Sequence, residues 1–489
     1  MCEIESMAEL IFIPSPGRGH LLANLEMAKL LVSRDRRLSA TVLVIRPFYD
    51  PASAAHSYAA LAGDGSDSRI RFVDISDPAA LALSDPEGST SPFHYIANHK
   101  DRVREEVFRR IQDFKDSDRR LAGFVVDMFC TPMIDVAGEF GVPTYVFFTC
   151  AASTLGVIFH FQKLRDSDHR DITKYADQMV SVPSFRFPVA GKLMPTGLLD
   201  IDGGDAKLID LAKRFRGTKG ILINTFYELE SYAIDSLLAG EKIPPVYPVG
   251  PVLSPGEDKN RNDTMKWLDT QPDKSVVYLC FGSKGTFKEV QLKLIATALE
   301  RSGYRFLWSL RKPLQNQQMY RTPGEYENPE EVLPEGFLER TKSVGKVIGW
   351  APQVAVLSHG AVGGFVSHCG WNSTLESLSC GVPLATWPLY AEQQLNAFLL
   401  VKELRVAVEI KMDYKQSNNV IVGADEIENG IRRLMEGGSE IRANAEALKA
   451  EALKATDGAA GRERGSASKY LRQFIDDAVK NSLPNETKN

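Results

Sequence analysis

The chain has 489 residues, which is too many for one hydrophobic core and indicates two domains of about 200–250 residues each. Hydrophobic residues make up 44% and charged residues 25% of the sequence, as in an ordinary globular protein. The net charge of −5 and the lack of a long basic run argue against nucleic acid or an anionic membrane as a partner.

The cysteines and the N-terminus bear on the compartment. The six cysteines contain no C-x-x-C pair, so we expect reduced thiols in a cytoplasmic protein. The first residues, MCEIESMAEL, are acidic and lack the basic region of a signal peptide. The longest weakly polar run, residues 145–161, contains Thr149, Ser153 and His160. We therefore interpret it as a buried strand that leads into a buried helix, and not as a membrane span.

The start of the chain predicts a parallel α/β sheet. Residues 10–14 form an apolar strand, SPGRGH at 15–20 a turn and 21–33 a helix, before a second strand at 40–46. This order implies ligands at the carboxyl ends of the strands. Leu22 replaces the third glycine of a dinucleotide fingerprint, so the turn alone is weak evidence for a nucleotide.

The pattern continues through the first half of the chain. We expect loops at 52–92, an amphipathic helix at 94–114 and a polar lid or acceptor loop at 165–205. Further strands are expected at 70–75, 121–126, 141–149 and 220–224, the last followed by a helix through residue 238.

Two polar residues follow strands of this first sheet. His20 closes the first turn, and Asp127 comes directly after the strand at 121–126. Because the carboxyl ends of parallel strands meet at one rim, we expect both side chains there. An imidazole held by a carboxylate is a general base with a fixed tautomer. A single histidine after a glycine turn is more often structural, so the residues alone leave both interpretations open.

A second β-turn-α series follows a segment at 251–273 that is rich in Pro, Gly, Asp and Asn, and which we interpret as an interdomain linker. It begins with a strand at 275–280, a turn at 281–285 that contains Ser283, and a helix at 290–301. The remaining expected features are a strand at 304–310, a charged surface loop at 312–332, a segment at 344–349, two or three helices up to about 456, and a last amphipathic helix marked by Tyr470, Leu471, Phe474, Ile475, Ala478 and Val479.

The stretch 350–393 predicts an anion site. Its middle combines a buried strand at 361–367, a tight polar turn and a helix that opens at Asn372 and Ser373. The unpaired N–H groups and the dipole at a helix start attract anions. His368 and the two side chains at the helix start add donors at the same place. We therefore expect a diphosphate here.

The flanks of this turn indicate a nucleotide sugar. Ser373 and Glu376 also fit a capping box, in which they only satisfy the helix start. Trp350 beside a Pro-fixed turn suits stacking on a base, which is typically worth about 1–3 kcal/mol. Glu376 can bind a ribose diol, as acidic residues do in other nucleotide folds. An apolar face and hydroxyl partners for a hexose are expected from Trp371, Glu392 and Gln393.

The 44 residues from 350 to 393, with the N-terminal PSPGRGHL, resemble the signature of plant secondary-product UDP-glycosyltransferases, glycosyltransferase family 1. The likeness covers essentially the whole chain. It implies the α/β fold called GT-B, with two Rossmann-like domains facing each other across a cleft and a C-terminal helix that returns to the N-terminal domain. The implied boundaries are 1–250 for the acceptor-binding domain, 251–273 for the linker, 274–456 for the domain that binds the nucleotide sugar, and 457–489 for the returning helix.

The resemblance also implies a reaction, the inverting transfer of glucose from UDP-glucose to a hydroxyl or carboxyl group of a flavonoid, phenylpropanoid or terpenoid. His20 would take the acceptor's proton with support from Asp127, and the donor domain would stabilise the leaving UDP without a metal or further cofactor. Gln393 points to glucose, while other hexoses and a pentose stay open. The implied substrate-binding residues are Ser283, Trp350, Ala351, Gln353, His368, Trp371, Asn372, Ser373, Glu376, Ala391, Glu392, Gln393 and Thr149.

Other classes of protein share part of the pattern. A Rossmann oxidoreductase would need G-x-G-x-x-G with a following acid, and a glycoside hydrolase would need two facing carboxylates. A non-catalytic sensor of nucleotide sugars would dispense with His20 and Asp127. A metal at His368 and Cys369 lacks further ligands. One departure from the family is the lack of a Pro shortly after His20. We expect a monomer that binds a UDP-sugar and a small acceptor.

Overall fold

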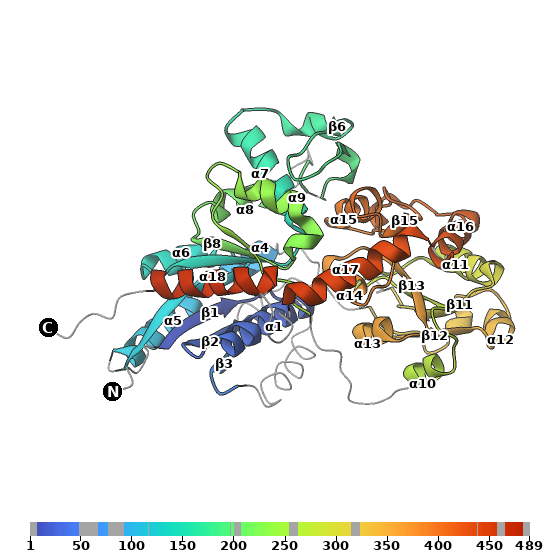
Figure 1. The fold of residues 1–489 in the computed structure, drawn as a ribbon, viewed down its shortest axis with the longest axis horizontal. Coiled ribbons are helices and arrows are strands. Elements are labelled where there is room, and N and C mark those ends of the chain that lie inside the picture. The colour runs from blue at the N-terminus through green and yellow to red at the C-terminus, as the bar shows by residue number, and fades with distance from the viewer. Residues whose placement is uncertain are drawn as a thin grey trace. The chain divides into compact units, whose positions relative to one another are not determined.

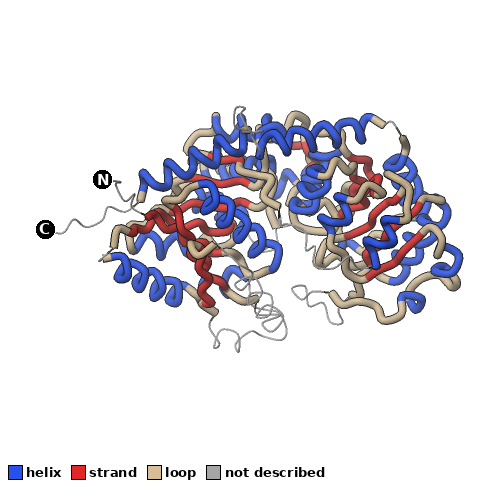
Figure 2. Tube along the Cα trace, turned by 60° about the horizontal axis from the view of Figure 1, so that its bottom comes forward, coloured by secondary structure: helices blue, strands red, loops and turns tan. Residues whose placement is uncertain are grey.

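A computed structural model describes residues 7–47, 67–76, 92–115, 117–195, 197–199, 207–253, 263–313, 323–437, 439–456 and 465–482. The chain divides into two compact units. The first comprises Met1–Gln162, Lys207–Ser254 and Ala455–Asn489, and the second Lys163–Ala206 and Pro255–Lys454. In each, helices cover both faces of a parallel sheet, as the strands in red and helices in blue of Figure 2 show. The sequence predicted a single domain boundary near residue 250. In the structure, the segment Lys163–Ala206 also belongs to the second unit. Most of the expected loops at 52–92 and parts of the segments at 251–273, 312–332 and 457–489 lie outside the described residues.

The sheet of the first unit has seven strands within the described residues, in the order β3-β2-β1-β4-β5-β8-β9. The order reverses between β1 and β4, whose last pair is Ile13↔Val126. Both faces are buried, since Phe124 belongs to one apolar cluster and its neighbour Val125 to the other. The strands are β1 (Met7–Ile13), β2 (Leu38–Val44), β3 (Ile70–Asp74), β4 (Arg119–Asp127), β5 (Thr144–Phe148), β8 (Gly220–Ile223) and β9 (Val246–Pro248). The helices are α1 (Arg18–Arg34), α4 (Pro92–Ala97), α5 (Lys100–Phe114), α6 (Met133–Glu139), α7 (Ala152–Asp166, which crosses the boundary of the unit), α8 (Lys207–Phe215), α9 (Tyr227–Leu238) and α18 (Ser466–Asn481).

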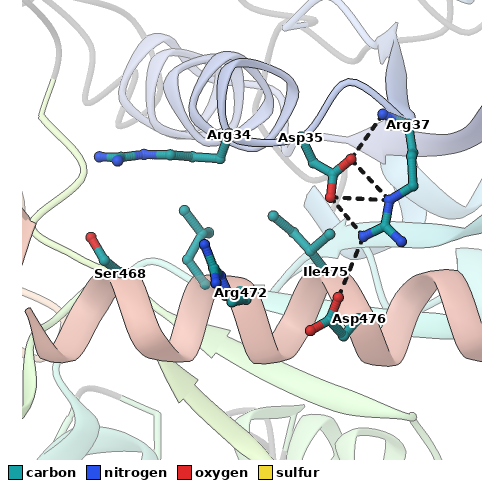
Figure 3. Close-up of a pocket in the computed structure, with 8 residues that line it drawn as sticks. Arg34, Asp35, Arg37, Ser468, Arg472, Ile475 and Asp476 are labelled. Atoms are coloured by element: carbon teal, nitrogen blue, oxygen red, sulfur yellow. Dashed lines mark hydrogen bonds and ion pairs between the residues drawn. The ribbon is translucent and has the colours of Figure 1, made fainter. Parts of the chain in front are cut away.

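The last helix, α18, packs on this first sheet, which confirms the expectation of a returning helix (Figure 1). Leu471, Phe474, Ile475 and Ala478 enter the apolar cluster that also contains Tyr145 and Tyr247. A polar contact joins α18 to the turn after α1. Arg37 in that turn pairs with Asp35 beside it and reaches Asp476 of α18 across 3.4 Å (Figure 3). A small cavity of about 270 Å³ lies between the two helices.

The second unit repeats the arrangement with six described strands in the order β12-β11-β10-β13-β14-β15. Here the order reverses between β10 and β13, whose last pair is Cys280↔Ser367. The strands are β10 (Val276–Cys280), β11 (Arg305–Ser309), β12 (Gly345–Ile348), β13 (Val362–Ser367), β14 (Leu384–Thr386) and β15 (Ala407–Glu409), with a separate antiparallel pair β6 (Met179–Val180) and β7 (Val189–Ala190). The helices are α10 (Asp263–Asp269), α11 (Glu289–Ser302), α12 (Phe337–Thr341), α13 (Gln353–Ser358), α14 (Trp371–Ser379), α15 (Gln393–Phe398), α16 (Ala424–Met435) and α17 (Glu440–Thr456, whose last two residues belong to the first unit), and a π-helix covers Leu399–Glu403.

Some local expectations were wrong. The expected helix at 94–114 is two helices, because His99 (φ −92°, ψ 4°) leaves the helical region between α4 and α5. Helix α1 begins at Arg18, so His20 lies in its first turn and not before it. The part of 165–205 that the structure describes holds β6, β7 and two short 3₁₀ helices. Across the described residues, we find no helix with the length and apolar character that crossing a membrane requires.

Candidate functional site

The first group of site residues lies where the strand order of the first sheet reverses. Strands β1 and β4 are neighbours, so the turn into α1 and the end of β4 meet at the same carboxyl edge. His20 Nδ1 lies 2.9 Å from Asp127 Oδ2. The imidazole is 33% exposed and the carboxylate fully buried, so one face of the pair is open to solvent. The structure therefore brings together the two residues that the sequence placed at one rim.

The buried Asp127 carboxylate accepts hydrogen bonds at both oxygens. Ser15 Oγ donates to Oδ1 at 2.5 Å, as does the Phe129 N–H at 3.2 Å. Asn24 Nδ2 donates to Oδ2 at 3.1 Å, beside His20. Burial alone would raise the pKa of Asp127, but the charge and hydrogen bond of His20 and the bonds from Ser15 and Phe129 hold that pKa below its ordinary value. The group is thus a carboxylate that fixes the orientation and tautomer of His20.

The turn after β5 adds a hydroxyl to this group. Thr149 Oγ1 lies 3.4 Å from His20 Nδ1 and is buried. Glu230 of α9 fixes the next turn of chain: its carboxylate accepts from Ala152 N at 2.8 Å and from Ser153 N at 2.9 Å. The first N–H groups of α7 are thereby satisfied by a side chain from elsewhere in the unit. Burial raises the pKa of Glu230, which is 4% exposed.

The second group of site residues lies at the corresponding reversal of the second sheet, between β10 and β13. His368 follows β13, and its Nε2 lies where a side chain on either of two glycines would collide with it. A Cβ built on Gly282 would be 2.6 Å from that nitrogen, and one on Gly370 2.5 Å. Burial lowers the pKa of His368 to about 4, so the imidazole is neutral at physiological pH. It can donate a hydrogen bond but carries no charge.

Helix α14 begins one residue earlier than the sequence suggested. Its N-cap is Gly370 and Ser373 already lies inside the helix, so the capping-box interpretation of Ser373 and Glu376 is wrong. Both side chains are instead held by Gln353 at the start of α13, whose Nε2 donates to Ser373 Oγ at 2.7 Å and to Glu376 Oε2 at 2.6 Å. Burial raises the pKa of Glu376 to about 7, although the bond from Gln353 opposes the shift. These residues therefore form a polar cluster beside the helix start.

Two observations indicate that this cluster is built for a ligand. His368 Nδ1 and Asn372 Oδ1 are buried without a hydrogen-bond partner among the described residues, which is costly unless a ligand or water supplies one. The backbone is also in the left-handed region at Cys369 (φ 61°) and Ala391 (φ 57°), which costs of order 1–3 kcal/mol for each such residue and is concentrated at functional sites.

The residues expected to bind base and sugar differ in exposure. Trp350 is 51% exposed and leaves an indole face to solvent, whereas Ala351 is buried. Trp371 is only 3% exposed, so the open apolar face that we expected of it is not present. Gln393 is buried and accepts from Leu389 N and Tyr390 N through Oε1, which fixes the turn that carries Ala391 and Glu392. Ser283 lies exposed in the turn after β10.

Sequence reasoning missed three residues of these groups. Each makes a hydrogen bond to a residue more than 75 positions away in the sequence. Ser15 and Asn24 donate to Asp127, and Glu230 accepts from the Ser153 N–H. Only the Asn24 position carried a signal, because it lies one helical turn after His20. Among the described residues, no three His, Cys, Asp or Glu side chains are grouped so that they could hold a metal ion.

Two Rossmann-like parallel sheets, one with a histidine–carboxylate pair and one with a polar cluster at a helix start, define the GT-B class of glycosyltransferases. The similarity of the chain to known proteins supports this class. The family model for UDP-glucoronosyl and UDP-glucosyl transferase matches residues 244–437. The chain is similar to UDP-glycosyltransferase 71E1 of Stevia rebaudiana, with 50% identity covering 96% of this chain and 98% of the relative. It is similar to UDP-glucose flavonoid 3-O-glucosyltransferase 6 of Fragaria ananassa, with 48% identity covering 97% and 99%.

Solved structures show the same fold. A UGT transferase from Siraitia grosvenorii in complex with UDP superposes with a TM-score of 0.84 at 46% identity, covering 96% of this chain and all of that one. Medicago truncatula UGT71G1 complexed with UDP-glucose gives a TM-score of 0.79 at 38% identity, covering 98% and 100%. The chain belongs to the plant UDP-glycosyltransferase family, glycosyltransferase family 1, and is a UDP-sugar-dependent glycosyltransferase.

Proposed function

We propose that the protein transfers glucose from UDP-glucose to a hydroxyl or carboxyl group of a small lipophilic acceptor, with inversion at the anomeric carbon, to give a β-glucoside. The observation that carries the proposal is the His20–Asp127 pair, 2.9 Å apart, with a buried carboxylate and a part-exposed imidazole. This arrangement suits a general base, which typically contributes about 10²–10⁴-fold to a rate.

In the proposed reaction, His20 takes the proton of the acceptor through Nε2, because Nδ1 is directed at Asp127. The acceptor oxygen forms a bond to the anomeric carbon as the bond to the β-phosphate oxygen of UDP breaks. The proton ends on His20 as an imidazolium, which the Asp127 carboxylate stabilises. A single displacement from the side opposite UDP turns an α-linked donor into a β-linked product.

The leaving diphosphate gains negative charge in this step. We assign its stabilisation to the start of α14, to the neutral His368 donor and to the Asn372 and Ser373 side chains, with Ser283 from the turn after β10. Hydrogen-bond donors and a helix dipole of this kind act best when they are fixed before the reaction. These groups do what a divalent metal does in other transferases, so we expect no metal requirement.

For the rest of the donor, we assign the base to Trp350 and Ala351, and the ribose to Glu376 and Gln353. Ala391, Glu392 and Gln393 are assigned to the hexose, with Thr149 on its outer hydroxyl and Trp371 as a buried support below the turn. The choice of glucose is supported by the Medicago structure, which contains UDP-glucose, and by the flavonoid glucosyltransferase of Fragaria. That relative's name also supports flavonoids as the class of acceptor to test first; phenylpropanoids and terpenoids follow.

The test is a screen of UDP-sugars against flavonoid, phenylpropanoid and terpenoid acceptors, with UDP release as the first readout. The configuration of the product follows from the coupling of its anomeric proton in NMR. We expect UDP-glucose to be the preferred donor, a β-linked product, and the same rate with and without EDTA. An α-linked product would overturn inversion, and hydrolysis of the sugar without an acceptor would overturn transfer. The monomeric state and the cytoplasmic location stay predictions of the sequence.

A further inference from the structure

The structure assigns a role to Asn24, a residue that neither the sequence signature nor the proposed reaction uses. Asn24 is fully buried on α1, one helical turn after His20. Its Nδ2 donates to the His20 carbonyl at 2.9 Å and to Asp127 Oδ2 at 3.1 Å. Its Oδ1 is buried with no hydrogen-bond partner among the described residues. A buried amide oxygen without a hydrogen-bond partner costs free energy. The presence of Asn24 beside Asp127 therefore needs an explanation other than the stability of the helix.

The important feature is which oxygen of Asp127 the amide contacts. Oδ2 is also the oxygen that faces His20 Nδ1 at 2.9 Å, whereas Ser15 Oγ and Phe129 N contact Oδ1. Because His20 and Asn24 are four residues apart on one helix, their side chains lie on the same face and share this one acceptor. Each donor to a carboxylate withdraws charge from it, and a less negative carboxylate stabilises an imidazolium less.

We propose that Asn24 is a positioning residue that competes with His20 for Asp127 Oδ2, and thereby sets how strongly His20 holds the proton it takes from the acceptor. The inference rests on the proposed general-base role of His20. With Asn24 in place, His20 is free of its proton over a wider range of pH, at the cost of being a slightly weaker base.

Several described groups lie near His20 besides Asn24. Asp127 faces it from β4, and the buried Cys130 thiol next to Ser15 is neutral, because burial and the Asp127 charge raise its pKa. The Phe129 ring packs edge-on at 5.5 Å and the Thr149 hydroxyl lies 3.4 Å away, and both are uncharged. Arg18, two residues before His20 on α1, is exposed to solvent.

The test compares the pH profile of kcat/KM for the native protein and Asn24→Leu, an apolar replacement of similar size. We expect the rise of kcat/KM with pH to move upward by about 0.5–1 pH unit, so that activity below the midpoint falls about three- to tenfold while the plateau at high pH changes little. Met27→Leu, a conservative apolar change at another fully buried position of α1, is the matched control and should leave the profile in place.

A direct readout is the titration of His20 in protein labelled with ¹³C-histidine, assigned by the signal that His20→Gln removes. The midpoint of that signal should move up in Asn24→Leu by the same amount as the kinetic profile. Asn24→Met serves if the Leu variant does not fold, since it also removes the donor. A loss of activity that is equal at every pH, with an unmoved titration, would show that Asn24 only supports the fold and overturn the inference. Normal turnover by His20→Ala would instead overturn the proposed base, which separates the two failures.

Discussion

We expect the buried carboxyl of Glu376 to make the affinity for UDP depend on pH. Glu376 lies one turn into α14, and burial raises its pKa to about 7 while Gln353 donates to it at 2.6 Å. At neutral pH the empty site is therefore a mixture of the neutral and ionised forms. If Glu376 accepts hydrogen bonds from the ribose hydroxyls, as proposed, only the ionised form binds well, and UDP must displace a proton at lower pH.

The size of the effect follows from that pKa. Below pH 7, each unit of pH should weaken the apparent affinity up to tenfold, so we expect UDP to bind about tenfold more weakly at pH 6 than at pH 8 through this group alone. The effect on the empty protein has the opposite sign. Because the folded protein favours the neutral carboxyl, this contribution to stability is full below the ordinary pKa of 4.5 and is lost as pH rises through about 7. Glu376→Gln should therefore stabilise the empty protein at pH 8 by up to about 3 kcal/mol.

The assay is calorimetric titration of UDP at pH 6, 7 and 8 into the native protein and Glu376→Gln. The variant is the necessary control, because the phosphate of UDP also titrates in this range and affects both proteins equally. We expect the variant to bind about tenfold more weakly at pH 8, since a neutral amide replaces a charged acceptor, and the difference to close by pH 6. A constant ratio of the two affinities across this range would refute the reasoning.

Three further predictions concern single contacts. Trp350→Ala should weaken UDP binding about 5- to 150-fold, the loss expected for one stacked base, whereas Trp350→Phe should keep most of the affinity; equal affinity of the Ala variant would contradict stacking. Gly282→Ala would place a Cβ 2.6 Å from His368 at φ 75° and should destroy UDP binding, while Gly303→Ala at φ 71°, with no atom within 4 Å, has only the backbone strain and should bind UDP normally. Glu230→Ala leaves the Ala152 and Ser153 N–H groups without their acceptor and should lower the free energy of unfolding in urea by about 1–3 kcal/mol, whereas Glu230→Gln should lose less; no loss in the Ala variant would show that water replaces the cap.

The sequence predicted those parts of the fold that long, regular patterns encode. The strand that ends on Asp127 and the strand and turn before α14 are continuous apolar runs bounded by polar residues, and both were found. The three-residue strands β9, β14 and β15 are too short to show a period, and only pairing with neighbours defines them.

The candidate site divides in the same way. His368 follows β13 directly, and His20 lies in the first turn of the helix after β1, so their places at the carboxyl edges could be predicted from the order of elements alone. What holds them could not. Ser373 and Glu376 have the spacing of a capping box, but Gly370 is the N-cap of α14, and Gln353 donates to both side chains. The burial of Trp371 could not be predicted either, because a tryptophan beside a glycine turn suits both a sugar-binding face and a core position.

The hydrogen bonds that Ser15, Asn24 and Phe129 donate to Asp127 were the main feature of the site that the sequence did not predict. Asn24 looked like one more polar residue in a helix, and its contact spans 103 positions of sequence. A buried carboxylate recruits donors from whichever elements surround it, and only the packing of β1, α1 and β4 shows which elements those are.

The proposed reaction depends most on the imidazole of His20, which we expect to take the acceptor's proton while UDP is bound by other residues. The most direct measurement is the turnover of His20→Ala with UDP-glucose and an acceptor found in the screen, together with the affinity of the same variant for UDP. We predict a loss of turnover of about 10²–10⁴-fold with UDP affinity within about twofold of the native protein. Turnover close to the native rate, with UDP bound normally, would contradict the central claim.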